Sequence, residues 1–167
     1  ERNSYNRSVL KLHSGSAFLR GAGFTSEGQF PFIDKVNIES FSKKRVYQST
    51  YTNKVESIQD YDPSKKQLMV RIESPTEFPN YYTKKTNSSK LTKVTDFKNP
   101  FKELQNVKKQ TITYTRDDGL ELSGILYLPL NYDEEKKEKM PMILWAYPRE
   151  FKDRKSASQS SKNSNEF

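Results

Sequence analysis

The chain has 167 residues, a net charge of +8 at pH 7 and 32% hydrophobic residues, a low apolar share for a self-contained domain. It has no cysteine, which excludes disulfides, thiol nucleophiles and thiolate metal sites. Aromatic residues make up 13% of the chain, which argues against disorder, and no apolar run reaches the roughly 18 residues that span a bilayer.

The sequence up to Asn106 is predicted to form short antiparallel strands. Turn formers such as Asp62-Pro63-Ser64 separate runs that are rich in Val, Ile, Tyr and Phe. These runs predict strands at residues 16–20, 32–37, 45–49, 55–61, 67–73, 80–85 and 91–95. The last four are the size of one β-propeller blade, and residues 9–49 could form the preceding blade. No sequence repeat accompanies them, so periodicity by itself favours a meander.

A shift in composition at residues 96–106 marks a linker, and stronger alternation follows it. Strands are predicted at residues 110–116 and 120–128, on either side of Asp117-Asp118-Gly119. That tripeptide is a hairpin signal, because glycine readily adopts the positive φ that tight turns need. After a charged loop, the continuous apolar run at residues 142–146 predicts a strand buried on both faces. The Ser-, Lys- and Asn-rich tail from Lys152 is predicted to be an irregular loop.

The positive charge is spread along the chain and does not gather in one patch. Basic doublets lie in or beside turn-like stretches, at Lys43-Lys44, Lys65-Lys66, Lys84-Lys85, Lys108-Lys109 and Lys136-Lys137. Solvated turns account for these doublets without a nucleic-acid partner. The acidic clusters at residues 117–118 and 133–135 lack ligand-like spacing, so no metal or cofactor is expected.

Few residues could carry chemistry. The single imidazole belongs to His13, and the sequence contains no G-x-S-x-G elbow. Because α/β-hydrolases order their triad as Ser, acid, His, His13 stands at the wrong end and is predicted to be a surface or sheet histidine. Tyr147 follows the apolar run at residues 142–146 and precedes Pro148, which favours an extended backbone. Its phenol could donate to a developing oxyanion, or its ring could simply pack at a domain edge.

Two long motifs carry a family resemblance. They are R-D-D-G-L-E-L-S-G-I-L-Y-L-P from Arg116 and M-P-M-I-L-W-A-Y-P-R-E-F from Met140. Upstream stretches add R-I-E-S-P-T-E-F-P-N-Y-Y from Arg71 and G-F-T-S-E-G-Q-F-P-F from Gly23. Together they resemble serine peptidases of the prolyl oligopeptidase family, in the branch that contains bacterial peptidases and plant glutamyl endopeptidase-like proteins.

The resemblance implies a mainly β chain in two parts. Residues 1–106 would be C-terminal blades of a β-propeller, and residues 107–167 the N-terminal part of an α/β-hydrolase domain, cut before the catalytic triad. It also implies peptide substrates, a Ser-Asp-His triad downstream of Phe167, and a place for the Tyr147 hydroxyl in the oxyanion hole. The tail after Lys155 departs from the family, whose members tend to have glycine near that point. Bacterial relatives favour a secreted or periplasmic location.

The alternative is a non-catalytic, β-rich module that binds a protein or glycan partner through exposed aromatic residues and basic turns. This interpretation stays open because the chain alone contains no competent active site, so whether it is itself an enzyme is not decided. Unpaired strand edges would also allow self-association.

Overall fold

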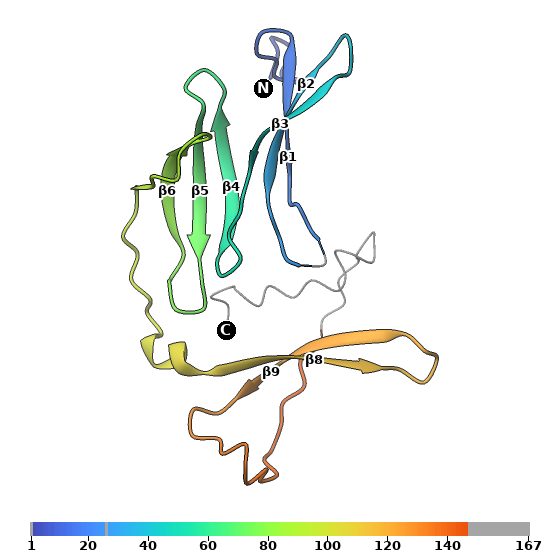
Figure 1. Cartoon of the computed structure of the whole chain (residues 1–167), viewed down its shortest axis with the longest axis vertical. Coiled ribbons are helices and arrows are strands. Elements are labelled where there is room, and N and C mark those ends of the chain that lie inside the picture. The colour runs from blue at the N-terminus through green and yellow to red at the C-terminus, as the bar shows by residue number, and fades with distance from the viewer. Residues whose placement is uncertain (1, 26, 147–167) are drawn as a thin grey trace.

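The computed structural model describes residues 2–25 and 27–146 (Figure 1). These residues form nine strands and one short 3-10 helix, with no α-helix among them. The strands make three antiparallel sheets, as the mainly β prediction requires. The described residues contain no helix that is long and apolar enough to cross a membrane.

The first sheet has the order β1 (Ser16–Gly21), β2 (Phe32–Asn37) and β3 (Lys43–Gln48). The second sheet has the order β4 (Val55–Asp62), β5 (Gln67–Glu73), β6 (Asn80–Lys85) and β7 (Thr92–Lys93). The 3-10 helix η1 (Lys102–Asn106) then leads to a two-stranded hairpin, β8 (Lys108–Thr115) and β9 (Glu121–Leu128).

The predicted strands at residues 16–128 are confirmed, with ends that shift by a few residues. The second sheet is the expected four-stranded meander, since each strand pairs with the next along the chain. The first sheet has three strands, one fewer than a four-stranded blade. The predicted linker contains the helix η1, which the sequence did not indicate.

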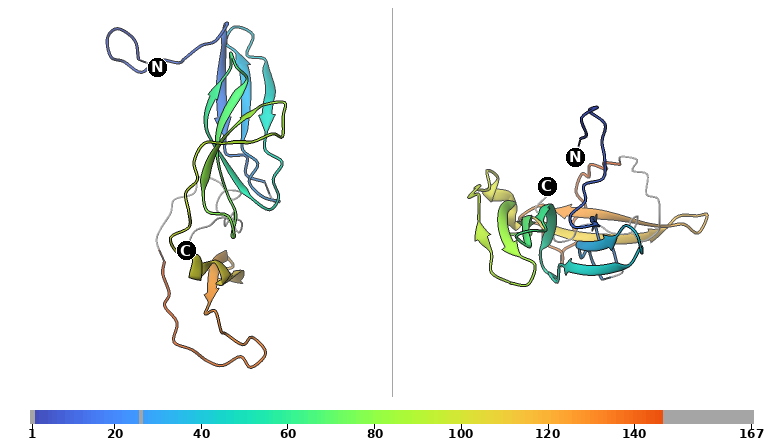
Figure 2. Two further views of the ribbon diagram at one scale, coloured as in Figure 1. Left: turned by 90° about the vertical axis from the view of Figure 1, so that its left-hand side faces the viewer. Right: turned by 90° about the horizontal axis from the view of Figure 1, so that it is seen from above.

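The apolar core lies between the first and second sheets, which stand side by side in Figures 1 and 2. In β5, every second side chain is buried, so that Leu68, Val70 and Ile72 share one face. Ile33 of β2 and Tyr47 of β3 belong to the same cluster and join the first sheet to the second. Full burial of a side chain such as Leu68 contributes about 1.5–3 kcal/mol.

The β8–β9 hairpin lies apart from this core, below the two sheets in Figure 1. Its strands pair in register from Lys108 opposite Leu128 to Thr115 opposite Glu121. Gly119 in the connecting turn has a φ of 84°, which confirms the predicted need for glycine there. Side chains along both strands are exposed or half-buried, because no other described sheet covers either face of the hairpin.

The strand predicted at residues 142–146 is wrong for the structure as it stands. These residues have no strand assignment, and their side chains are exposed, with Ile143 at 94% and Trp145 at 85%. A strand buried on both faces needs paired neighbours and covering layers, and no described residue supplies either to this segment. The irregular loop predicted from Lys152 lies outside the described residues.

Candidate functional site

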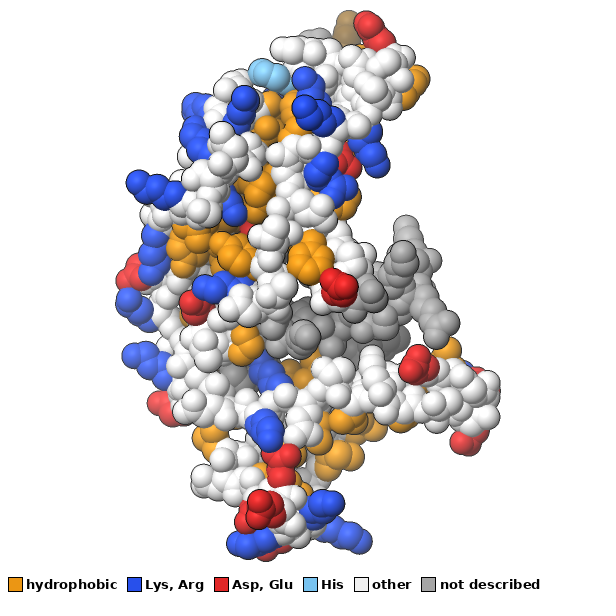
Figure 3. All heavy atoms as spheres, viewed as in Figure 1, with side chains coloured by type: hydrophobic (Ala, Val, Ile, Leu, Met, Phe, Trp, Pro, Cys, Tyr) orange, Lys and Arg blue, Asp and Glu red, His pale blue; other side chains and the backbone are white. Residues whose placement is uncertain are grey.

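The residue with the sharpest functional prediction, Tyr147, lies outside the described residues. Candidate features in the described part are a hollow between the first two sheets, a buried polar cluster beside their core, and the acidic turns. Figure 3 shows basic side chains spread over the edges of both sheets, with apolar side chains between them.

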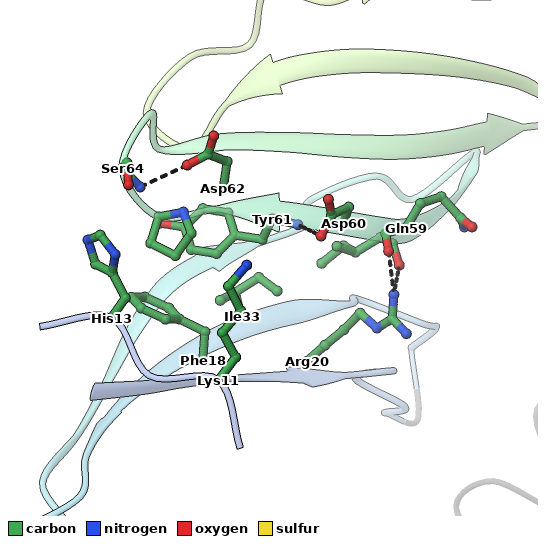
Figure 4. Close-up of a pocket in the computed structure, with 12 residues that line it drawn as sticks. Lys11, His13, Phe18, Arg20, Ile33, Gln59, Asp60, Tyr61, Asp62 and Ser64 are labelled. Atoms are coloured by element: carbon green, nitrogen blue, oxygen red, sulfur yellow. Dashed lines mark hydrogen bonds between the residues drawn. The ribbon is translucent and has the colours of Figure 1, made fainter. Parts of the chain in front are cut away.

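The inter-sheet hollow has a volume of about 560 Å³ and lies between β1 and β4 (Figure 4). Its apolar wall includes Phe18 and Tyr61, whose ring centroids are 5.2 Å apart in a tilted arrangement. Arg20 closes one end, where its Nη1 donates to the backbone carbonyl oxygens of Ile58 and Gln59 at 2.6 and 2.9 Å. The hollow therefore combines aromatic surface with a cation that ties β1 to β4.

A bulge in β4 explains how Arg20 finds these carbonyls. The pairing of β4 with β5 shifts register between Ile58 and Asp60, which leaves Gln59 without a partner in the ladder. A bulge re-aims the backbone of its strand, and here it presents two neighbouring carbonyl groups to one guanidinium. The bond between the sheets thus depends on a local irregularity in β4.

His13, Asp62 and Ser64 all line this hollow, but they do not form a catalytic triad. Asp62 accepts from the backbone N–H groups of Ser64 and Lys65 at 2.9 and 3.1 Å. The bond from Lys65 is the main cause of a pKa below the usual range for Asp62. No hydrogen bond in the described part of the chain joins the His13 imidazole to either residue, as a triad would require. His13 is a sheet-edge histidine near Phe18, as predicted.

The buried polar cluster consists of Tyr47, Ser49, Glu56 and Lys84. Glu56 is 1% exposed, and it accepts hydrogen bonds from Tyr47 Oη at 2.6 Å and from Ser49 Oγ at 3.0 Å. Lys84 Nζ donates to Tyr47 Oη at 2.9 Å and lies 3.8 Å from Glu56 Oε2. Burial, followed by the Glu56 hydrogen bond, raises the pKa of Tyr47 well above its usual range, so its hydroxyl stays protonated and donates.

This cluster joins β3 of the first sheet to β4 and β6 of the second. It corrects the interpretation of the Lys84-Lys85 doublet as solvated, since the Lys84 side chain is only 8% exposed. A Lys-Lys doublet gives no local sign that one member is buried. The signal in the sequence was the alternation of β6, which places Lys84 and Lys85 on opposite faces.

The acidic turns make ion pairs with neighbouring basic residues. Asp118 pairs with Arg116, and Glu134 pairs with Lys108. Among the described residues, no group of three or more His, Cys, Asp or Glu side chains could hold a metal ion.

The described residues therefore bring together an aromatic-lined hollow and structural polar bonds, and no hydrogen bond among them joins a serine hydroxyl to an imidazole. No family model matches the chain. The chain is 34% identical, over an alignment of 158 positions that covers 89% of this chain, to a probable chloroplastic glutamyl endopeptidase of Oryza sativa subsp. japonica. It is 32% identical over the same length to the protein of that name in Arabidopsis thaliana.

The chain is related in sequence to proteins named as peptidases. It spans only 17% and 16% of the length of these two relatives. Among solved structures, the apo form of the AtxE2 isopeptidase aligns with 72% of this chain and 18% of its own, at 18% identity and a TM-score of 0.39. A variant of that isopeptidase with Astexin3-dC4 bound aligns with 71% of this chain and 17% of its own, at the same identity and TM-score.

Proposed function

We propose that this chain is part of a serine peptidase of the prolyl oligopeptidase family. The observation that carries the proposal is the 34% identity to a probable glutamyl endopeptidase over 89% of the chain. Residues 1–106 would supply C-terminal blades of a β-propeller, and residues 107–167 the first part of an α/β-hydrolase domain. The four-stranded meander β4–β7 and the separate β8–β9 hairpin are consistent with that division.

The chemistry would come from a Ser-Asp-His triad encoded beyond residue 167. The serine hydroxyl would attack the peptide carbonyl while the imidazole takes its proton, and the carboxylate would orient the imidazole. The imidazolium would then protonate the departing amine, leaving an acyl-enzyme. A water molecule, deprotonated by the same imidazole, would release the acid and regenerate the serine.

Tyr147 would donate its hydroxyl to the oxyanion of the tetrahedral intermediate. A phenol has a pKa of about 10 and is protonated at neutral pH, so it can donate without a prior proton transfer. The segment before it is apolar and exposed in this chain, from Met142 to Trp145. Burial of that segment in a completed sheet would hold Tyr147 at a fixed position, which a donor to a transition state needs.

The first test is the reading frame that contains this chain. A G-x-S-x-G elbow followed by Asp and then His beyond Phe167 would support the proposal. A stop codon directly after Phe167 would contradict it for this chain, and a β-rich binding module would become the working hypothesis.

The second test uses the complete protein. We expect a fluorophosphonate probe to label its serine. The names of the relatives lead us to expect cleavage of a peptide that contains one Glu in preference to the same peptide with Gln. Tyr147→Phe should lower kcat by about 10²–10³-fold, while Tyr114→Phe, which removes an exposed hydroxyl in β8, should leave it unchanged. A fall of less than about threefold in kcat would remove Tyr147 from the mechanism.

A further inference from the structure

The N-terminal arm, residues 2–13, ends in a turn that starts a β-hairpin with β1. His13 and Ser16 exchange two backbone hydrogen bonds, of 2.9 and 3.1 Å. Between them, Ser14 and Gly15 have φ values of 48° and 69°. Positive φ at both central residues defines a type I′ turn, whose twist matches that of two paired strands. This turn directs the arm to run antiparallel beside β1.

The edge of β1 that faces the arm is open. Within the described part of the chain, β1 stands at one end of its sheet and has β2 as its only partner strand. Backbone groups point alternately to the two edges of a strand. Those of Phe18 and Arg20 therefore point to the same edge as the groups of Ser16 that bond His13. This edge of β1 therefore presents backbone donors and acceptors, and the turn already bonds those of Ser16.

We propose that residues 8–12 close onto this edge as the fourth strand of the first sheet. The turn fixes the register, because His13 opposite Ser16 places Lys11 opposite Phe18 and Leu10 opposite Leu19. Lys11 and Phe18 would form the next hydrogen-bonded pair, and Leu10 and Leu19 the non-hydrogen-bonded pair that follows it.

Side-chain chemistry fits that register. Leu10 and Leu12 are exposed in the arm, and closure sets them opposite Leu19 and Ala17 on one face of the sheet. A shift of one residue would instead place Lys11 on that face. The apolar pattern of the arm and the geometry of the turn therefore specify the same pairing.

Closure also changes the inter-sheet hollow. Lys11 and His13 of the arm already line its open side, and Phe18 and Arg20 of β1 line its wall (Figure 4). A strand along β1 would occupy the space beside that wall. The arm is thus a strap that completes the first sheet and covers the hollow, an inference that does not depend on the proposed peptidase function.

A cysteine pair tests the register in this chain, which has no cysteine of its own. Residues in a non-hydrogen-bonded antiparallel pair have Cα atoms about 4.5 Å apart, which suits a disulfide. We expect Leu10→Cys with Leu19→Cys to form a disulfide under mild oxidation. The matched pair Val9→Cys with Leu19→Cys, whose side chains would point to opposite faces, should stay reduced. If both cysteine pairs oxidise equally, or if neither pair oxidises, the proposal is wrong.

Amide hydrogen exchange of the unaltered chain gives a second measurement. The Leu19 amide faces β2 and serves as the reference for a formed sheet. Closure predicts that the Phe18 amide also exchanges at least about tenfold more slowly than an unprotected amide. Gly15→Val, which opposes the positive φ of the turn, should restore fast exchange at Phe18 and leave Leu19 slow. Fast exchange at Phe18 in the unaltered chain overturns the proposal, whatever the rate at Leu19.

Discussion

Strand β5 of the second sheet and strand β9 of the hairpin have similar lengths and similar alternating patterns. In β5, Leu68 and Val70 are completely buried between the first and second sheets. In β9, Leu122 and Leu126 are only half-buried, because no other described strand or sheet covers that face. Alternation decides which side chains share a face, and the presence of a second layer decides what that face contributes to stability.

The largest expected effect comes from Leu68→Ala. The variant leaves a cavity between the sheets, and we expect it to lower the free energy of unfolding by about 4 kcal/mol. Leu126→Ala removes the same atoms from a half-buried site in the hairpin and should cost about 1 kcal/mol. Urea denaturation, followed by circular dichroism, measures both. Similar losses from the two variants would contradict the assignment of the core to the first two sheets.

The next largest loss of stability is expected from breaking the buried polar cluster. Lys84→Met keeps the length of the side chain but removes the charge beside Glu56, whose carboxylate would then be buried without a cation. We expect a loss of about 3 kcal/mol in the free energy of unfolding. Lys85→Met is the matched control on the exposed face of β6 and should change stability by less than about 0.5 kcal/mol. If Lys84→Met and Lys85→Met lower the free energy of unfolding equally, Lys84 contributes no more to stability than an exposed lysine.

The same contrast explains what could be predicted from sequence. Strands from residue 16 to residue 128 follow from local alternation and turn residues such as Gly119, which need no knowledge of neighbours. The run at residues 142–146 depends on strands and layers that its own residues cannot supply, so its apolar composition did not yield a strand.

The residues of the candidate features divide in the same way. Glu56 of β4 and Lys84 of β6 lie in the same sheet, 28 positions apart (84 − 56), and both contact Tyr47 of the first sheet. Alternation could assign them to a face of their sheet, but it could not show that the first sheet covers that face. Arg20 meets β4 through the bulge at Gln59, a register shift with no marker in the sequence. Tyr147 lies outside the described residues, and its role stays a prediction.

A smaller loss of stability is expected from a substitution in the turn of the hairpin, and none from a matched substitution in its strand β9. Gly119→Ala forces a Cβ into a backbone with a φ of 84°, although open space surrounds the site. We expect about 1 kcal/mol less stability for the hairpin, read from faster exchange of its cross-strand amides. Gly124→Ala is the control in β9, where the added Cβ would make ordinary contact with Ile112 at 3.7 Å. Its effect should be neutral or slightly stabilising, and equal loss in both would show that φ at Gly119 is not the cause.

The smallest effect is a pH dependence of the hairpin. The hydrogen bond from Arg116 is the first cause that holds the pKa of Asp118 below its usual value of 3.8, followed by the bond from the Leu120 amide. A lowered pKa in the folded hairpin means that this contribution is present above pH 3.8 and is lost as the pH falls through the lower, folded value. The protection of amides in β8 and β9, measured against their intrinsic exchange rate at each pH, should therefore decrease below the folded pKa of Asp118, while amides of β5 stay protected. Asp118→Asn should remove this response and Asp117→Asn should keep it, since the latter leaves the pair with Arg116 intact. The same pH dependence in both variants would mean that another group controls the acid response of the hairpin.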